Sequence, residues 1–255
     1  MPTRDKSPVG VPCWVDLLTS DTERARDFYA TVLGWKAEEP SEEFGGYFMF
    51  TRGGVPVAGG MGNQSPAETP DAWSIYLCVA DADATIATAT QNGATVIVPG
   101  MKVADLGTMA MLLDPGGAAI GLWAPGQFGG FGVYGESGAP VWFELHTRDY
   151  DKALAFYKGV FGWTTGVVSD SEEFRYSTVQ DGDAAVAGVY DARSFLQDEE
   201  RSHWTVYFGV DSTDDAVAKV LKLGGSVRRP AEDTPYGRMA TVADPMQTEF
   251  RLMTL

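Results

Sequence analysis

Two stretches of this chain repeat one another: "PCWVDLLTSDTERARDFYATVLGW" from Pro12 to Trp35, and "PVWFELHTRDYDKALAFYKGVFGW" from Pro140 to Trp163. Aligned without a gap, they are identical at 11 of 24 positions. The repeat continues downstream, where "WSIYLCVAD" (73–81) returns as "WTVYFGVDS" (204–212) and "GTMAMLLDP" (107–115) returns as "GRMATVADP" (237–245). Because the offset stays between 128 and 131, the pattern indicates a duplicated unit of about 125 residues rather than a short-period solenoid.

The duplication predicts three segments. The first unit covers residues 1–125 and the second covers 139–255. Between them, "GQFGGFGVYGESG" at 126–138 is rich in glycine and is interpreted as a linker, with a flexible lid as the alternative.

Each unit has the same predicted order of elements. In the first, residues 13–19 alternate as a half-buried strand does, and Ser20 or Asp21 can cap a helix over 22–33 that ends at Gly34. Two or three strands are expected between 45 and 61. A strand at 73–79 then leads to a second helix over 82–92, and two further strands flank the turn at Asp114. Each unit therefore contains two βαβββ segments, four in the whole chain, in an α+β fold.

The bulk composition is that of a globular protein, with 44% hydrophobic and 21% charged residues among 255. A net charge of −16 without a basic cluster argues against nucleic acid as a partner. No apolar run is long enough for a membrane helix, and the N-terminus lacks the apolar region of a signal peptide. Two cysteines, Cys13 and Cys78, suggest buried reduced thiols. We therefore expect a cytoplasmic protein, monomeric or homodimeric.

The ordered set of motifs resembles the vicinal oxygen chelate superfamily of glyoxalase I, bleomycin-resistance proteins and extradiol dioxygenases. The resemblance rests on a strand and an Asp, a helix with "FY", then "LGW" or "FGW", a second strand–helix pair, and "DP" before the last strand. It spans about 12–123 and 140–253, and is nearest to tandem actinobacterial members, some of which accompany aromatic antibiotic pathways. It implies paired modules whose curved sheets wrap a cleft.

The resemblance also implies where a metal would be held: one ligand early in the first strand, one early in the strand before the second helix, and a Glu on the last strand. The matching residues are Trp14, Ser74 and Gly121 in the first module, and Trp142, Thr205 and Arg251 in the second. None of these side chains is a usual ligand for a divalent ion. We therefore expect no metal at the usual positions and no cofactor.

Strand parity predicts which side chains line the cleft instead. In the first module, these are Trp14, Asp16, Leu18, Ser74, Tyr76, Cys78, Gly121 and Trp123. In the second, they are Trp142, Glu144, His146, Thr205, Tyr207, Glu249 and Arg251. The opposite face is apolar in both modules and should pack under the helices.

The polar residues of the second cleft allow three interpretations. Glu144, Glu249 and Arg251 could form an ion-pair network. Glu144 or His146 could act as a general acid or base in a lyase, isomerase or oxygenase. Glu144, His146 and Glu249 could instead form a displaced metal site. The other histidine, His203, is expected in an exposed loop.

Aromatic side chains divide in the same way. Trp35, Trp73, Trp163 and Trp204 are predicted to be core residues. Those with the parity of the cleft suit stacking on a planar ligand, with an acid nearby for a cationic group, or else they fill an empty cleft. The favoured hypothesis is metal-independent binding of a planar aromatic small molecule, possibly cationic, for sequestration or as an accessory in antibiotic biosynthesis. Its contacts would come from Trp14, Asp16, Ser74, Tyr76, Trp123, Trp142, Thr205, Tyr207, Glu249 and Arg251.

Overall fold

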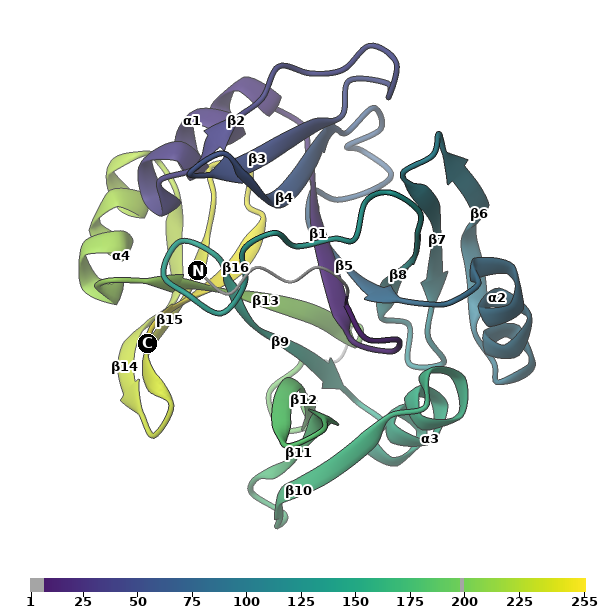
Figure 1. Ribbon diagram of the computed structural model, residues 1–255. Helices are drawn as coiled ribbons and strands as arrows, with labels where there is room; N and C mark the ends of the chain where they lie inside the picture. Colours follow the sequence, from purple (N-terminus) through teal and green to yellow (C-terminus); the bar gives the residue numbers. More distant parts are fainter. Residues whose placement is uncertain (1–6, 198–199) are drawn as a thin grey trace.

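The computed structural model describes residues 7–197 and 200–255 and contains two eight-stranded mixed sheets, one from each repeat (Figure 1). The first sheet has the strand order β2-β3-β4-β1-β5-β8-β7-β6. Its elements are β1 (Pro12–Thr19), α1 (Thr22–Leu33), β2 (Lys36–Ala37), β3 (Phe48–Arg52), β4 (Val55–Gly62), β5 (Ala72–Cys78), α2 (Ala82–Gln91), β6 (Thr95–Val103), β7 (Gly107–Leu113) and β8 (Ala119–Pro125).

The second sheet repeats this order as β10-β11-β12-β9-β13-β16-β15-β14. Its elements are β9 (Pro140–Thr147), α3 (Tyr150–Phe161), β10 (Thr164–Asp170), β11 (Arg175–Asp181), β12 (Ala184–Asp191), β13 (His203–Val210), α4 (Thr213–Lys222), β14 (Ser226–Thr234), β15 (Gly237–Ala243) and β16 (Glu249–Thr254). Neither sheet closes into a barrel. The predicted α+β fold of two tandem modules, each with two βαβββ segments, is therefore confirmed.

Helix ends follow the sequence signals. The Asp21 side chain accepts from the Arg24 N–H at 3.0 Å, and Gly34 adopts the left-handed conformation that ends α1. The second copy repeats both features with Asp149 and Gly162 around α3. Since β1 pairs antiparallel with β5 and parallel with β4, the first strand of each βαβββ segment lies at the centre of its sheet. Side chains near its middle are therefore flanked by strands on both sides.

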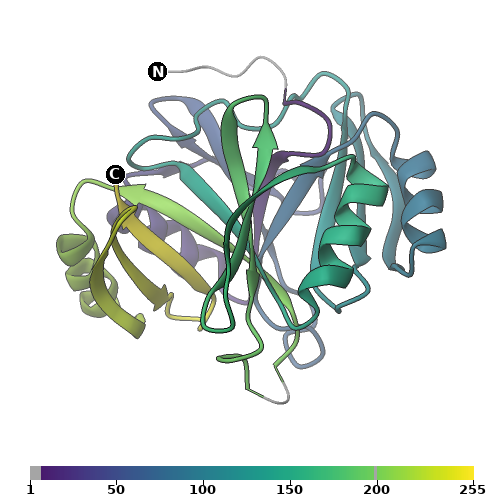
Figure 2. The same cartoon turned by 90° about the horizontal axis from the view of Figure 1, so that it is seen from below.

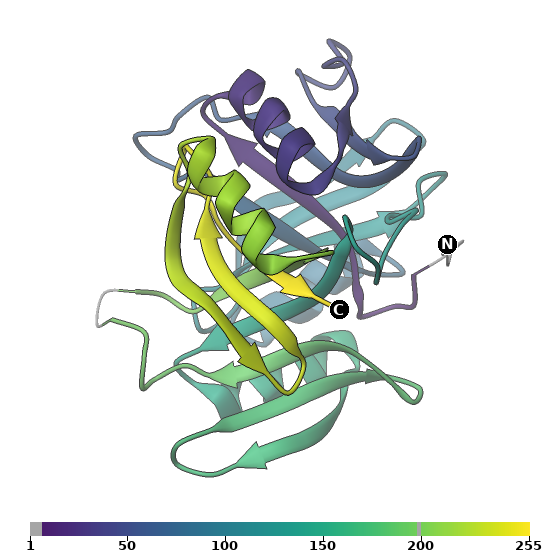
Figure 3. The same ribbon diagram turned by 90° about the vertical axis from the view of Figure 1, so that its left-hand side faces the viewer.

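The core is shared between the two modules. Figures 1 and 3 show α1 beside α4, and Figure 2 shows α3 beside α2. The predicted apolar faces are fully buried, but they pack on the other module as well as on their own helices. For example, Phe208 of β13 lies 5.2 Å, centroid to centroid, from Trp35 and 5.1 Å from Trp73. Trp35, Trp73, Trp163 and Trp204 are all buried, which confirms their prediction as core residues.

Two hydrogen bonds related by the repeat join the modules. The hydroxyl of Tyr29 donates to the Asp244 carboxylate at 3.1 Å, and the hydroxyl of Tyr157 donates to Asp114 at 3.0 Å. Each carboxylate also accepts backbone N–H groups of its own "DP" turn. Because buried polar groups need partners, the two tyrosines require the modules to be docked.

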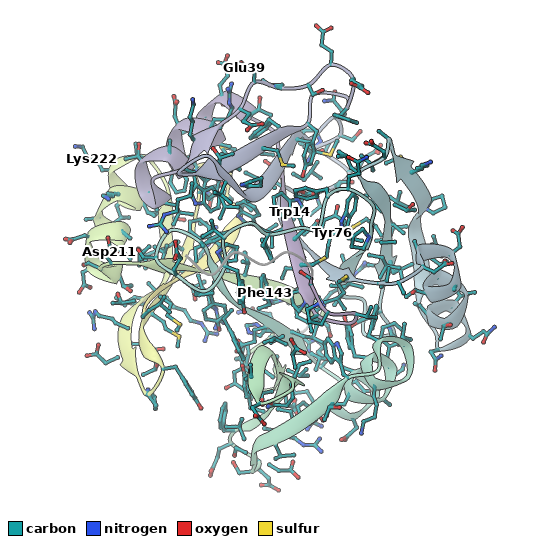
Figure 4. The ribbon with its side chains drawn as sticks, viewed as in Figure 1. Trp14, Glu39, Tyr76, Phe143, Asp211 and Lys222 are labelled. Atoms are coloured by element: carbon teal, nitrogen blue, oxygen red, sulfur yellow. The ribbon has the colours of Figure 1, made fainter. Side chains whose placement is uncertain are left out.

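The segment 126–138 forms no helix or strand, yet it is packed against the first module. Phe131 and Val133 are buried, and the Phe131 and Gly132 N–H groups donate to the carbonyls of Cys13 and Pro56. Its aromatic rings also stack on Phe143 of β9, at 5.8 Å from Phe131. Figure 4 shows Phe143 near the centre of the molecule with Trp14 and Tyr76, whereas Glu39, Asp211 and Lys222 lie at the periphery. The segment is thus an ordered part of the core rather than a loose tether.

Candidate functional site

The face of the first sheet that carries Trp14 and Asp16 is not covered by helices and is called the helix-free face. On it, the carboxylate of Asp16 accepts several hydrogen bonds. Asp16 Oδ1 accepts hydrogen bonds from Trp14 Nε1 at 2.8 Å and from the Tyr47 hydroxyl at 2.6 Å. Tyr47 also accepts from the Trp14 indole at 2.9 Å, so the three side chains form a closed triangle. On neighbouring β5, Ser74 lies opposite Asp16 and Tyr76 lies opposite Trp14. These four residues therefore share one face of the sheet, as strand parity predicted.

Two glycines make room for the tyrosines. A Cβ atom at Gly59 would lie 1.8 Å from the Tyr47 hydroxyl oxygen, and one at Gly121 would lie 2.3 Å from the Tyr76 ring. Gly121 occupies the strand position at which the family resemblance implies a metal-binding Glu. In this chain, the Tyr76 ring lies over that position.

Asp16 has no ion pair within the part of the chain that the structure describes. Burial raises the pKa of its carboxyl from 3.8 to about 6, against the lowering effect of hydrogen bonds from Tyr47, Trp14 and Tyr76. An ionised carboxylate without a counterion, on a partly exposed surface, suits a ligand that supplies a positive charge.

The raised pKa predicts how stability depends on pH. Folding disfavours the ionised form of Asp16. The contribution of Asp16 to the free energy of unfolding is therefore most favourable below pH 3.8 and is lost as pH rises through about 6. A pKa shift of this size corresponds to a loss of at most about 3 kcal/mol in the free energy of unfolding, and the loss is smaller where water reaches the side chain. We expect Asp16→Asn to remove this loss, so that the variant gains stability relative to wild type between pH 5 and 7.5 in urea titrations. Equal pH profiles would contradict the assignment.

Five methionines share this face, and the sequence interpretation missed them. Cross-strand register places Met49, Met61, Met101, Met109 and Met111 on the same side as Asp16 and Leu18. None is fully buried, and Met61 and Met101 are 38% and 51% exposed. Alternation in "GTMAMLL" at 107–113 is the signal that could have found two of them.

The aromatic residues expected to stack on a ligand are less accessible than predicted. Trp14, Tyr76 and Trp123 are all buried. Phe128 of the 126–138 segment lies edge-on against Trp14, with ring centroids 4.9 Å apart, and its carbonyl accepts from Trp123 Nε1 at 2.8 Å. Phe128 thus packs on the Trp14 indole, and these three buried rings lie on the same face of the sheet as the more exposed methionines.

The second module repeats the arrangement with Glu144 in place of Asp16. Glu144 Oε2 accepts from the Tyr176 hydroxyl at 2.8 Å, and Oε1 accepts from the Tyr207 hydroxyl at 2.8 Å. Oε1 also lies 2.7 Å from His146 Nε2 and 3.3 Å from Arg251 Nη1. The Trp142 indole donates to the Tyr176 hydroxyl at 3.1 Å. Both oxygens of Glu144 are thus occupied by protein donors.

Charge is balanced at this centre. Burial would raise the pKa of Glu144, but the hydrogen bond and charge of His146, the charge of Arg251 and the Tyr176 hydroxyl together lower it. Burial lowers the pKa of His146, only partly opposed by Glu144. Near neutral pH, the cluster is therefore an ionised carboxylate paired with a guanidinium, beside a neutral imidazole.

Two predictions for this face are wrong. Glu249 does not join Glu144: it is exposed at the start of β16, with its carboxylate 4.0 Å from Arg228 Nε. The ion-pair interpretation therefore holds for Glu144 and Arg251 but not for Glu249, and the displaced metal site loses one of its three ligands. His203 is the first residue of β13 rather than part of a loop, half-buried opposite His146 with ring centroids 5.0 Å apart. Thr205 is buried opposite Glu144, as predicted from parity.

The residues present do not fit the metal that the family resemblance implies. The six corresponding positions supply two indoles, two hydroxyls, a glycine and a guanidinium. Within residues 7–197 and 200–255, no group of three His, Cys, Asp or Glu side chains could hold a metal ion. The nearest candidate, Glu144, has its acceptor sites filled.

Comparison with known proteins agrees with the fold. A family model described as the glyoxalase/bleomycin resistance protein/dioxygenase superfamily matches residues 13–122 and 140–252. The chain belongs to this superfamily. Its relatives include CFP32 of Mycobacterium tuberculosis, whose name carries the word glyoxylase, with 35% identity over 99% of this chain and 98% of that protein. The anthracycline biosynthesis protein DnrV of Streptomyces peucetius is 33% identical over 96% and 94% of the two chains.

Solved structures share the fold at low sequence identity. A Mn(II)-bound glyoxalase from Novosphingobium aromaticivorans superposes with a TM-score of 0.65 and 15% identity, covering 96% of this chain and 82% of that one. The 2,3-dioxygenase LapB from Pseudomonas sp. KL28 gives 0.63 and 15%, covering 99% and 94%. The superfamily fold is thus shown over nearly the whole chain. No helix among the described residues has the length and apolarity needed to cross a membrane.

Proposed function

We propose that this chain is a small-molecule binding protein that holds a planar, cationic aromatic ligand against the helix-free face of its first module, without a metal ion. The observation that carries the proposal is Asp16, a half-buried carboxylate without an ion pair among the described residues, on a face lined with methionines. A cation bound there would supply the missing counterion.

The methionines favour an aromatic ligand. A thioether side chain is flexible and polarizable, packs well against ring edges and faces, and adapts to ligands of different shape. Met49 and Met111 lie on strands at either side of β1 and β5, so contacts would come from both sides of Asp16. The buried Trp14, Tyr76 and Trp123 would hold this lining in place.

The relatives support a role in secondary metabolism. DnrV and the anthracycline biosynthesis protein DauV of a Streptomyces species are each 33% identical to this chain, and anthracyclines are fused-ring aromatic compounds. We therefore propose sequestration or an accessory role in the biosynthesis of such a compound. The two cysteines, buried and not joined to each other, support a reducing compartment such as the cytoplasm.

An acid–base role for Glu144 and His146 has less support. Both side chains are buried, and the oxygens of Glu144 already accept from Tyr176, Tyr207 and His146. A general base must reach a substrate proton within hydrogen-bond distance. The first module offers the more accessible surface.

The proposal predicts binding that depends on pH. Titration with 10-methylacridinium, a permanent planar cation, should quench tryptophan fluorescence, and its affinity should rise about tenfold from pH 5 to 7.5 as Asp16 ionises. Asp16→Asn should weaken binding at pH 7.5 and abolish the pH dependence. Uncharged acridone should bind equally to both proteins at all pH values.

A second variant separates charge from packing. Met111→Ala should weaken binding of the acridinium and of acridone alike, by about fivefold to thirtyfold, because apolar contact is lost for both. Equal acridinium affinity in wild type and Asp16→Asn, or no binding at all, would refute the proposal.

A further inference from the structure

The helix-free face of the second sheet carries arginines where the first carries none. Arg251 on β16 replaces Gly121, and Arg229 lies two strands away on β14. Thr241 on β15 is the cross-strand partner of both. Cross-strand partners share a face of the sheet. Arg229 and Arg251 therefore lie on the same side, with Thr241 between them.

Arg251 is only partly satisfied. Its Nη1 lies 3.3 Å from Glu144 Oε1 and also donates to the Tyr207 hydroxyl, and its Cζ lies 5.0 Å from the Tyr207 ring centroid. Its Nε is buried and has no hydrogen-bond partner in the part of the chain that the structure describes. A buried N–H without an acceptor is costly, so such a donor in a native protein calls for an explanation.

Arg229 forms no ion pair with any described residue. Its exposed guanidinium lies over the Phe195 ring, 5.1 Å from the centroid. Phe195 in turn contacts Tyr190 at 5.0 Å and His146 at 5.4 Å, and the His146 Nε2 lies 3.3 Å from Arg251 Nη2. Phe195 therefore packs on Arg229 directly and is linked to Arg251 only through His146.

The position of Phe195 is fixed by a third arginine. Arg148 Nε donates to the Glu200 carbonyl at 2.8 Å, and Arg148 Nη2 donates to the Leu196 carbonyl at 3.1 Å. These bonds tie Leu196, the residue after Phe195, and Glu200 to the end of β9. The ring is thus supported from the end of β9, and it lies against Arg229 and His146.

We propose that the second module is a separate site for an aromatic ligand that carries an anionic oxygen, a carboxylate or a phenolate. The oxygen would accept from Arg251 Nε and lie near Arg229, and the ring would pack on Phe195. Glu144 neutralises Arg251, and Arg228 faces Glu249 at 4.0 Å, whereas Arg229 has no ion pair among the described residues; Glu232 shares the face through its cross-strand partner Met239. The two modules would then prefer ligands of opposite charge.

Calorimetric titration with 2-naphthoate and its uncharged analogue 2-naphthamide tests this site. Wild type should bind the carboxylate about tenfold more tightly than the amide, as expected for charge-assisted hydrogen bonds. Arg229→Gln should remove most of that difference and leave amide binding unchanged. Phe195→Ala should weaken both probes.

The matched control is Arg228→Gln, because Arg228 is the adjacent residue and donates instead to Gln247 at 2.6 Å. It should leave both affinities unchanged. Equal losses in the Arg228 and Arg229 variants would mean that only the general field of the protein attracts the carboxylate. No preference for carboxylate over amide in wild type would overturn the proposal.

The first-module proposal can fail independently of this one. Asp16→Asn should keep full affinity for 2-naphthoate, and Arg229→Gln should keep full affinity for 10-methylacridinium. A loss of both probes in either variant would show that the two modules do not bind separately, and would refute the inference.

Discussion

Replacing Glu144 with alanine should lower the free energy of unfolding by about 3–5 kcal/mol, the range for removing one partner of a buried ion pair. Glu144 Oε1 and Oε2 together accept from Tyr176, Tyr207 and His146, and Oε1 faces the guanidinium of Arg251. The substitution leaves the half-buried guanidinium of Arg251 without its counterion and two buried hydroxyls without their acceptor. Urea denaturation at pH 7, with the slope compared between variants, measures the loss.

Two comparisons sharpen the interpretation of this variant. Glu144→Gln keeps the shape and part of the hydrogen bonding but removes the charge, so its loss should be smaller than that of the alanine variant. Wild type should lose the contribution of Glu144 as pH falls below 4.5, because its folded pKa lies below that value. A loss under 1 kcal/mol for Glu144→Ala would mean that water reaches Arg251 freely.

The sequence was sufficient for the local architecture because its signals are local. Asp21 and Gly34 mark the ends of α1, and alternation along 13–19 and 73–79 separates the two faces of the sheet. Because the sequence is duplicated, each element predicted in the first module was predicted again at the matching position of the second. The same parity placed Asp16 and Glu144 on one face of their sheets.

What the sequence could not reveal depends on contacts between distant segments. Phe128 lies 114 residues after Trp14, and only the folded path of 126–138 brings its ring over that indole. Glu249 has the parity of Arg251, but it lies at the end of a strand, where solvent and Arg228 are available. Parity predicts a face and not a depth, so it could not separate buried Glu144 from exposed Glu249.

The two modules share the same arrangement of strands and helices but differ in the side chains on their helix-free faces. Asp16 with Tyr47 corresponds to Glu144 with Tyr176, and the glycine that faces each tyrosine is also repeated. The surrounding positions have diverged: Leu18 corresponds to His146, Met111 to Thr241 and Gly121 to Arg251. A face with one carboxylate among methionines has thus become one with an Arg–Glu pair, a second arginine and aromatic rings, without a change in fold. This divergence fits two sites of different specificity better than two copies of one site.

Trp163→Ala should destabilise the chain by about 3–5 kcal/mol, the range for truncating a buried aromatic side chain. Trp163 stacks on Tyr157 with centroids 4.4 Å apart, and its Nε1 donates to the Gly10 carbonyl at 2.6 Å. Tyr157 is the residue that reaches Asp114 of the first module, so the cavity would lie beside one of the hydrogen bonds that join the modules.

The control is Trp142→Ala, since Trp142 is only half-buried and makes one side-chain hydrogen bond, at 3.1 Å to Tyr176. It should cost about 1–2 kcal/mol, in proportion to its smaller buried area. Because Tyr29 and Tyr157 each donate to the opposite module, Trp163→Ala should lower a single cooperative thermal transition. Two separate transitions in calorimetry, with only one shifted by the substitution, would show that the modules are stable apart and that the shared core is not what couples them.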